Sequence, residues 1–163
     1  MQSSQEIVTL LKALWEEGGP HAPISKASQS LSAAQAFFRP APERHSIWQN
    51  VMHMAFWREH LVSTLKGEAK QLTDELLEHE NWPPHPDPAD SEAWNAARSR
   101  LEATQQALVQ LVASLDEARL QQPRRPGGRT SLASELVSYA VHDAYHVGQI
   151  MLLRALQGLA PLD

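Results

Sequence analysis

The stretch His142-Asp143-Ala144-Tyr145-His146-Val147-Gly148-Gln149-Ile150 lies in a largely apolar segment that extends from about residue 132 to residue 156 without a proline. This length and composition predict one long helix. Residues four apart share a helix face, so His142 and His146 point in the same direction. Two imidazoles on one face can bind a single divalent metal, although hydrogen-bonded core histidines show the same spacing. Any further ligand must come from another part of the chain.

Length and composition indicate a single domain, residues 1–163, with an ordinary 42% of hydrophobic residues. The chain has no cysteine, which excludes disulfides, thiolate ligands and a cysteine nucleophile. Its net charge of -5 argues against nucleic-acid binding, and the one basic cluster, at Arg124, Arg125 and Arg129, is small. Neither a signal peptide nor an uncharged apolar run of membrane-spanning length is found. We therefore expect a cytoplasmic protein that binds neither nucleic acid nor membranes.

Apolar residues recur at helical spacing in three further long segments, which are residues 4–17, 46–66 and 90–120. The best-defined start is Ser46-Ile47-Trp48-Gln49, which matches a capping box, and Gly67 marks the end of that helix. No alternation typical of strands is found. The sequence predicts an all-α protein whose four long helices pack as a four-helix bundle.

The connections between the long helices differ in length and composition. Residues 23–31 predict a short extra helix near the N-terminus, separated from the first long helix by Gly18-Gly19-Pro20. Residues 32–44 are predicted to be a connector. The longest connection, residues 68–89, is rich in proline and contains a possible helical piece at residues 71–79. We therefore expect a bundle with one long proline-rich loop.

A third imidazole is available on the helix predicted at residues 46–66. His53 lies in the otherwise apolar run Val51-Met52-His53-Met54-Ala55-Phe56-Trp57, where an unpaired imidazole would be costly to bury. A hydrogen-bonded core histidine is the simpler interpretation of His53 alone. Together with His142 and His146 it predicts a three-histidine site. Such a site leaves a fourth position for water or substrate, as catalytic zinc sites do.

Two segments resemble the paired signatures of the DinB-like superfamily: His53-Met54-Ala55-Phe56-Trp57, and His142 and His146 followed by Gly148-Gln149-Ile150. The spacing between them, Trp82-Pro83 and Trp94 are also similar, and the likeness covers about residues 7–158. The resemblance implies an up-down-down-up four-helix bundle that holds a divalent metal, usually zinc or nickel. Matched position by position, the metal ligands would be His53, His142 and His146.

The resemblance also implies a range of activities. Characterised proteins that this chain resembles include S-transferases that use bacillithiol or mycothiol, and a mycothiol-dependent isomerase. Some relatives are described as hydrolases, and many have no known activity. Relatives are often homodimers. The sequence itself identifies neither the thiol nor the substrate.

Several polar and aromatic residues are candidates for the surroundings of the metal. Gln149 can orient an imidazole, or it can form an ordinary hydrogen bond between helices. His60, about two turns beyond His53, is a candidate fourth ligand or general base, or a partly exposed histidine. The residues that can line a pocket are Gln49, Asn50, Phe56, Trp57 and Tyr139. Aromatic residues at helical spacing more often belong to the core, which we expect of Phe56.

Two residues next to the motifs have simpler interpretations. Asp143 makes the motif similar to a shortened H-E-x-x-H sequence, in which the acidic residue is a general base. Asp143 points about 100° away from His142 around the helix, so we expect it to be solvent-exposed. We expect His45 to contribute to helix capping or to face solvent.

Three functions are compatible with such a site. The first, favoured by the resemblance, is a metal-dependent transferase in which the ion holds the thiolate of a low-molecular-weight thiol for attack on a small-molecule electrophile. The second is a hydrolase in which metal-bound water is the nucleophile and His60 or Asp143 is the base. The third is a non-catalytic stress or binding protein that the metal stabilises. Composition and spacing do not separate the first function from the second.

Overall fold

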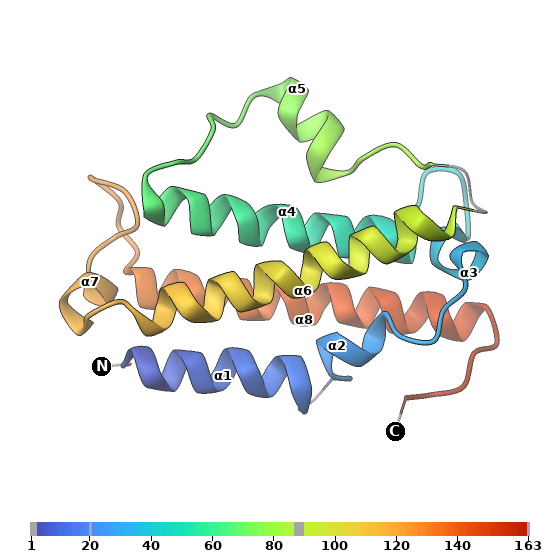
Figure 1. Cartoon of the computed structure of the whole chain (residues 1–163), viewed down its shortest axis with the longest axis horizontal. Helices are drawn as coiled ribbons and strands as arrows, with labels where there is room; N and C mark the ends of the chain where they lie inside the picture. The colour runs from blue at the N-terminus through green and yellow to red at the C-terminus, as the bar shows by residue number, and fades with distance from the viewer. Residues whose placement is uncertain (1–2, 20, 87–89, 163) are drawn as a thin grey trace.

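Four long helices lie lengthwise beside one another and form the bundle (Figure 1). They are α1 (Ser4–Glu16), α4 (Ile47–Lys66), α6 (Ser91–Ala113) and α8 (Leu132–Leu156). The computed structural model describes residues 3–19, 21–86 and 90–162, and within these residues it contains no strand. Followed from blue to red in Figure 1, α1 and α8 run in one direction and α4 and α6 run in the other. The predicted all-α, up-down-down-up bundle is confirmed.

In the described part of the connections the chain forms five short helical segments. They are α2 (Ile24–Ala27), α3 (Ala33–Phe37), α5 (Asp74–Leu76), the π-helix η1 (Leu77–Asn81) and α7 (Glu117–Gln121). The extra N-terminal helix is α2, which is shorter than the predicted residues 23–31. The helical piece predicted at residues 71–79 corresponds to α5 and η1, which lie over α4 in Figure 1, with η1 in contact with it. Pro20 and residues 87–89 of the proline-rich loop lie outside the described residues.

Two predicted segments differ from the structure because local caps start helices within them. The connector at residues 32–44 contains α3, which begins at a capping box formed by Ser32 and Gln35. The single helix predicted at residues 90–120 is two helices, α6 and α7. The side chain of Asp116 accepts a backbone hydrogen bond in the first turn of α7 and so defines a separate start. The apolar spacing continues through this break, so the boundary between α6 and α7 could not be seen from the spacing.

The two helices that carry the histidines have well-defined ends. At the start of α4, Ser46 Oγ accepts from the backbone N–H of Gln49 at 3.1 Å, and Gln49 Oε1 accepts from the backbone N–H of Ser46 at 3.2 Å. Gly67 ends α4 with a left-handed φ of 77°, which glycine adopts without strain. Ser131 starts α8 by accepting from the backbone N–H of Ser134 at 3.3 Å. These caps fix where the histidines lie along each helix.

Among the residues that the structure describes, the core consists of two apolar clusters. One joins α2, α3 and the first parts of α4 and α6 to the end of α8, and Val51, Trp94 and Ile150 belong to it. The other joins α1, the end of α4, the later part of α6, α7 and the start of α8. In the middle of α4 and α8, buried polar side chains replace apolar ones; they are His53, Arg58, His60, Asp143 and His146. The candidate site therefore lies in a polar layer of the bundle.

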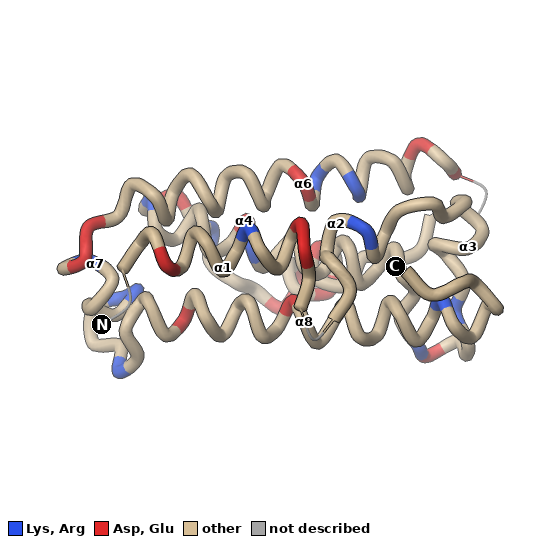
Figure 2. Tube along the Cα trace, turned by 90° about the horizontal axis from the view of Figure 1, so that it is seen from below, with Lys and Arg blue, Asp and Glu red and all other residues tan. Residues whose placement is uncertain are grey.

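Charged residues of both signs are spread over the helices and loops (Figure 2). Positions of Lys and Arg are interspersed with positions of Asp and Glu along the chain, whose net charge is -5. Among the described residues, no helix has the length and apolar character needed to cross a membrane.

Candidate metal centre

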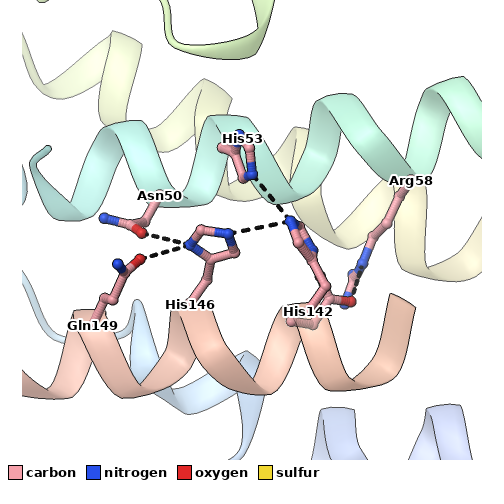
Figure 3. A network of polar contacts seen from close by, with 7 residues as sticks. Asn50, His53, Arg58, His142, His146 and Gln149 are labelled. Atoms are coloured by element: carbon pink, nitrogen blue, oxygen red, sulfur yellow. Dashed lines mark hydrogen bonds and ion pairs between the residues drawn. The ribbon is translucent and has the colours of Figure 1, made fainter. Parts of the chain in front are cut away.

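Three imidazole rings converge between α4 and α8 (Figure 3). His53 comes from α4, and His142 and His146 come from successive turns of α8. The Nε2 atom of His142 lies 3.0 Å from Nε2 of His53 and 3.2 Å from Nε2 of His146. One ring nitrogen of each histidine lies within 4.8 Å of the others. His53 and His146 are buried and His142 is half-buried, so the cluster lies just beneath the surface.

The ring of His146 is held by two amide oxygens. Its Nδ1 lies 2.9 Å from Oδ1 of Asn50 and 2.7 Å from Oε1 of Gln149. The amide nitrogen of Asn50 donates to the carbonyl of Ser46 at 2.8 Å. A carbonyl can only accept, so this contact places the oxygen of Asn50 toward His146. Nδ1 of His146 therefore carries the ring proton, and Nε2 carries the lone pair that a metal requires.

The ring of His142 is held by a carboxylate. Its Nδ1 lies 3.3 Å from Oδ1 of Asp143, and Arg58 donates to Oδ2 of Asp143 from Nε at 3.0 Å and from Nη2 at 2.8 Å. Burial alone would raise the pKa of Asp143, but Arg58 and His142 outweigh burial and hold that pKa below its ordinary value. The ionised carboxylate accepts from Nδ1 of His142, so Nε2 of His142 also presents a lone pair.

The expectation that Asp143 is solvent-exposed is wrong, because this residue is only 2% exposed. The face of α8 that carries Asp143 still points into the bundle, where α8 packs against both α1 and α4. Its partner Arg58 was not a sequence candidate, because the spacing of α4 does not distinguish a buried arginine from an exposed one. Only the packing of α4 against α8 brings the two charges together.

The ring of His53 is oriented by an aromatic stack. Trp82 lies nearly parallel to it, with ring centroids 3.9 Å apart, and His45 stacks on Trp82 at 3.7 Å. Gln49 donates from Nε2 to the carbonyl of Pro83 at 3.1 Å, which ties this segment of the loop to α4. His45 is exposed, as expected, but its ring also covers Trp82.

The protonation of the cluster suits a bound cation. Burial and then His146 and His142 lower the pKa of His53 to about 3, and burial and then His142 lower the pKa of His146 to about 4. These two rings are therefore neutral at neutral pH. With the ring protons on Nδ1, the lone pairs of His142 and His146 face each other across 3.2 Å, and a cation between them would remove their repulsion.

The distances suit a metal as well. Imidazole nitrogens bound at about 2.0–2.1 Å to a tetrahedral ion lie about 3.3 Å apart. The observed separations of 3.0 and 3.2 Å are close to this value. The residues present therefore fit a metal, and the three histidines could hold one divalent ion.

A cavity of about 370 Å³ opens beside the cluster and is lined by His53, Trp57, Ser138, Tyr139 and His142. It therefore reaches two of the three imidazoles and has aromatic walls from α4 and α8. A second opening, of about 610 Å³, reaches the two amides that hold His146 and is lined in part by Leu152 and Leu156 of α8.

The other candidates from the sequence lie at different distances from the cluster. The structure brings Gln149, Trp57 and Tyr139 to the site, whereas Gln49 contacts the proline-rich loop instead. His60 borders a separate cavity, and its Nε2 lies 3.4 Å from Nη2 of Arg125. Asn50 contacts His146 directly, and Phe56 is a buried core residue, as the sequence favoured.

The fold and the site together define an all-α bundle protein whose three interhelical histidines could hold a divalent metal. The family model described as the DinB superfamily matches residues 23–150, which includes all three histidines. The chain belongs to the DinB superfamily. The match is narrower than the likeness seen over residues 7–158, and α1 and the end of α8 lie outside it. No curated protein matches the chain at a significant level.

Proposed function

We propose that the chain binds one divalent metal, zinc or nickel, through His53, His142 and His146. The observation that carries this proposal is the convergence of three Nε2 atoms at 3.0 and 3.2 Å. In two of the rings, hydrogen bonds hold the proton on the opposite nitrogen. Zinc and nickel both bind neutral imidazoles well. The cavity next to His53 and His142 supports a site with room for a further ligand.

We further propose that the protein is a metal-dependent S-transferase that uses a low-molecular-weight thiol. When bound, the metal would lower the pKa of the thiol and hold it as a thiolate. The chain has no cysteine, so the thiol must be a cosubstrate. Trp57 and Tyr139 line the cavity and would bind the apolar part of the small-molecule electrophile. We expect this chemistry in the cytoplasm, where thiols are kept reduced.

The alternative is a hydrolase in which water is the nucleophile. Attack by water is aided by a general base, and the two residues considered for that role are poorly placed. Asp143 is buried and paired with Arg58, and His60 borders a different cavity. A metal that lowers the pKa of a bound thiol or of a bound water removes the need for such a base in either reaction, so the cobalt experiment below decides between them. A non-catalytic protein with a structural metal would not need a cavity at His53 and His142.

We also propose that two copies of the chain pair through α8. The exposed positions of this helix are uncharged: Ser134, Ser138, Val141, Tyr145, Gly148, Leu152, Ala155 and Leu156. The first seven recur at spacings of four and three residues. Tyr145 and Leu152 are 64% and 61% exposed, which is unusual for large apolar residues in contact with water only. This spacing is typical of paired helices. Gly148 has open space beside it and would permit close approach of a second helix.

The absence of cysteine makes the pairing easy to test. In an antiparallel pair centred near Gly148, a cysteine at that position would meet its own copy, so oxidised Gly148→Cys should form a covalent dimer. Asn95→Cys is the matched control, because Asn95 is exposed on α6. A monomeric mass by light scattering, together with equal cross-linking in both variants, would contradict the pairing.

Metal content tests the metal proposal. Purified wild-type protein is compared with His142→Ala and with His60→Ala, the second being a histidine outside the cluster. We expect about one zinc or nickel ion per chain in the wild type and in His60→Ala, and almost none in His142→Ala. Equal metal in the wild type and His142→Ala would overturn the proposal.

Cobalt substitution tests the transferase. Addition of a low-molecular-weight thiol to the cobalt-loaded protein should produce a new sulfur-to-cobalt charge-transfer band, because a thiolate would bind the ion. The His142→Ala protein should show no such band. A cobalt spectrum that does not respond to the thiol would contradict the transferase, and thiol-independent ester or amide hydrolysis would support the alternative.

A further inference from the structure

A buried ion pair joins the middle of α4 to the middle of α8, directly behind His142. Arg58 donates to Oδ2 of Asp143 at 3.0 and 2.8 Å, and the two residues are only 1% and 2% exposed. Burial of two charges costs free energy that their mutual attraction does not always recover. Apolar residues of similar size are often equally stabilising at such positions. The stability of the bundle alone therefore does not account for this pair.

The contacts of Asp143 are divided between its two oxygens. Arg58 occupies Oδ2 with two N–H groups, and Oδ1 faces Nδ1 of His142 at 3.3 Å. Arg58 extends from α4 toward α8 in Figure 3, where its guanidinium meets this carboxylate. Without the arginine, the carboxylate is free to turn away from the imidazole. The guanidinium thus fixes the carboxylate in the orientation that accepts from His142.

A third helix holds the arginine in place. The guanidinium carbon of Arg58 lies 5.5 Å from the ring centroid of Trp15 on α1, which is within the range of a cation–π attraction. Arg58 therefore links α1, α4 and α8 at the level of the cluster. Because its ion pair with Asp143 joins α4 to α8, Arg58 also fixes how these two helices are aligned lengthwise, and therefore where His53 lies relative to His142.

We propose that Arg58 and Asp143 are positioning residues of the metal site: the pair keeps the ring proton of His142 on Nδ1, so that Nε2 faces His53 and His146. This inference rests on the proposed metal-binding function, but the position of the ring proton is a property of the metal-free chain. In a neutral histidine, that position is set by the hydrogen bond that the ring makes. Loss of the pair should free the ring and weaken metal binding about 10- to 100-fold, as expected for partners of metal-binding imidazoles.

The test variant combines Arg58→Met with Asp143→Leu. It removes both charges together and fills the space with apolar atoms, so that neither charge is left buried and unpaired. The matched control combines Arg100→Met with Glu59→Leu. Arg100 of α6 donates to both carboxylate oxygens of Glu59 of α4, at 2.8 and 2.6 Å, and this pair lies outside the three-histidine cluster. Circular dichroism establishes that each protein is folded.

Two measurements are made on each protein. NMR spectra of the ring nitrogens in the metal-free state, at mildly alkaline pH, report which nitrogen of His142 carries the proton. Competition with a chromophoric chelator reports zinc affinity. We expect the proton on Nδ1 in the wild type and the control, a mixture of tautomers in the test variant, and zinc affinity about 10- to 100-fold weaker in the test variant only.

Two results would overturn the proposal. One is a wild-type His142 with its proton on Nε2, and this result decides the matter even if the test variant does not fold. The other is a folded test variant whose tautomer and zinc affinity equal those of the control. A wild-type chain that binds no zinc but keeps the proton of His142 on Nδ1 would overturn the metal-binding function and still support the positioning of the ring.

Discussion

The side-chain amides of Asn50 and Gln149 should be able to replace each other as the acceptor for the Nδ1–H group of His146. Nδ1 of His146 has one proton, and it lies 2.9 Å from the oxygen of Asn50 and 2.7 Å from that of Gln149. Either oxygen alone can accept this proton. We therefore expect Asn50→Leu or Gln149→Met alone to weaken zinc binding by no more than about threefold.

The double variant, Asn50→Leu with Gln149→Met, should lose much more zinc affinity than either single variant. With both oxygens gone, the Nδ1–H of His146 is left without a partner in a buried position, at a cost of about 1–3 kcal/mol. The metal-free chain can avoid this cost by moving the proton to Nε2, but the metal-bound chain cannot. The whole cost therefore falls on the affinity, which should drop about 5- to 150-fold.

Competition with a chromophoric chelator at fixed pH measures the four affinities, and chemical unfolding confirms that each variant is folded. Gln105→Met is the control, because Gln105 is a buried amide that donates to the Leu11 carbonyl at 3.0 Å, away from the histidines. We expect a coupling of more than about 0.5 kcal/mol between the two substitutions. Losses that simply add, or a double variant with wild-type affinity, would refute the reasoning.

Three further predictions concern the site and the core. Without metal, the free energy of unfolding should fall as the pH drops from 6.5 toward 4, because histidines in the unfolded chain bind protons in this range while the folded pKa values of His53 and His146 are about 3 and 4. Urea denaturation in the presence of a chelator measures this free energy, and a profile that does not change with pH would contradict the prediction. Trp82→Leu should weaken zinc binding by about 1 kcal/mol, because it removes the stack on His53 at 3.9 Å, and an unchanged affinity would argue against the stack as an orienting contact. Leu101→Ala should reduce the free energy of unfolding by about 2–5 kcal/mol without changing the amount of metal bound, because Leu101 is a fully buried core residue. Loss of metal in this variant would show that the core and the metal site are not separate.

The sequence was informative about features that depend on neighbours along one helix. The spacing of His142 and His146 determines that they share a face, and the capping box at Ser46 determines where α4 begins. The break between α6 and α7 was missed, because Asp116 caps a new helix while the apolar spacing continues across it. Local signals thus located the long helices but not every boundary.

The partners of the histidines depend on which helix faces meet in space. Asn50 is 96 residues from His146 in the sequence, and Arg58 is 85 residues from Asp143. Neither pair follows a spacing rule, so neither could be found by periodicity. His53 was found because an imidazole in an apolar run needs a partner, and because its surroundings resemble a known signature. The prediction that Asp143 is solvent-exposed was wrong because helix geometry gives the direction of a side chain but not which neighbouring helix it faces.

The charge balance around the cluster bears on which ligand completes the site. The charge of Asp143 is offset by Arg58 at 2.8 Å, so a divalent ion among three neutral imidazoles would keep nearly all of its own charge in a partly buried position. An anionic ligand relieves this imbalance, and a thiolate or a hydroxide would serve equally in that respect. The cavity at His53 and His142 adds aromatic walls, because Trp57 and Tyr139 can pack against an organic group. The organic substrate carries such a group in a transferase and in a hydrolase alike, so the arrangement suits an anionic ligand on the ion with an organic substrate packed beside it.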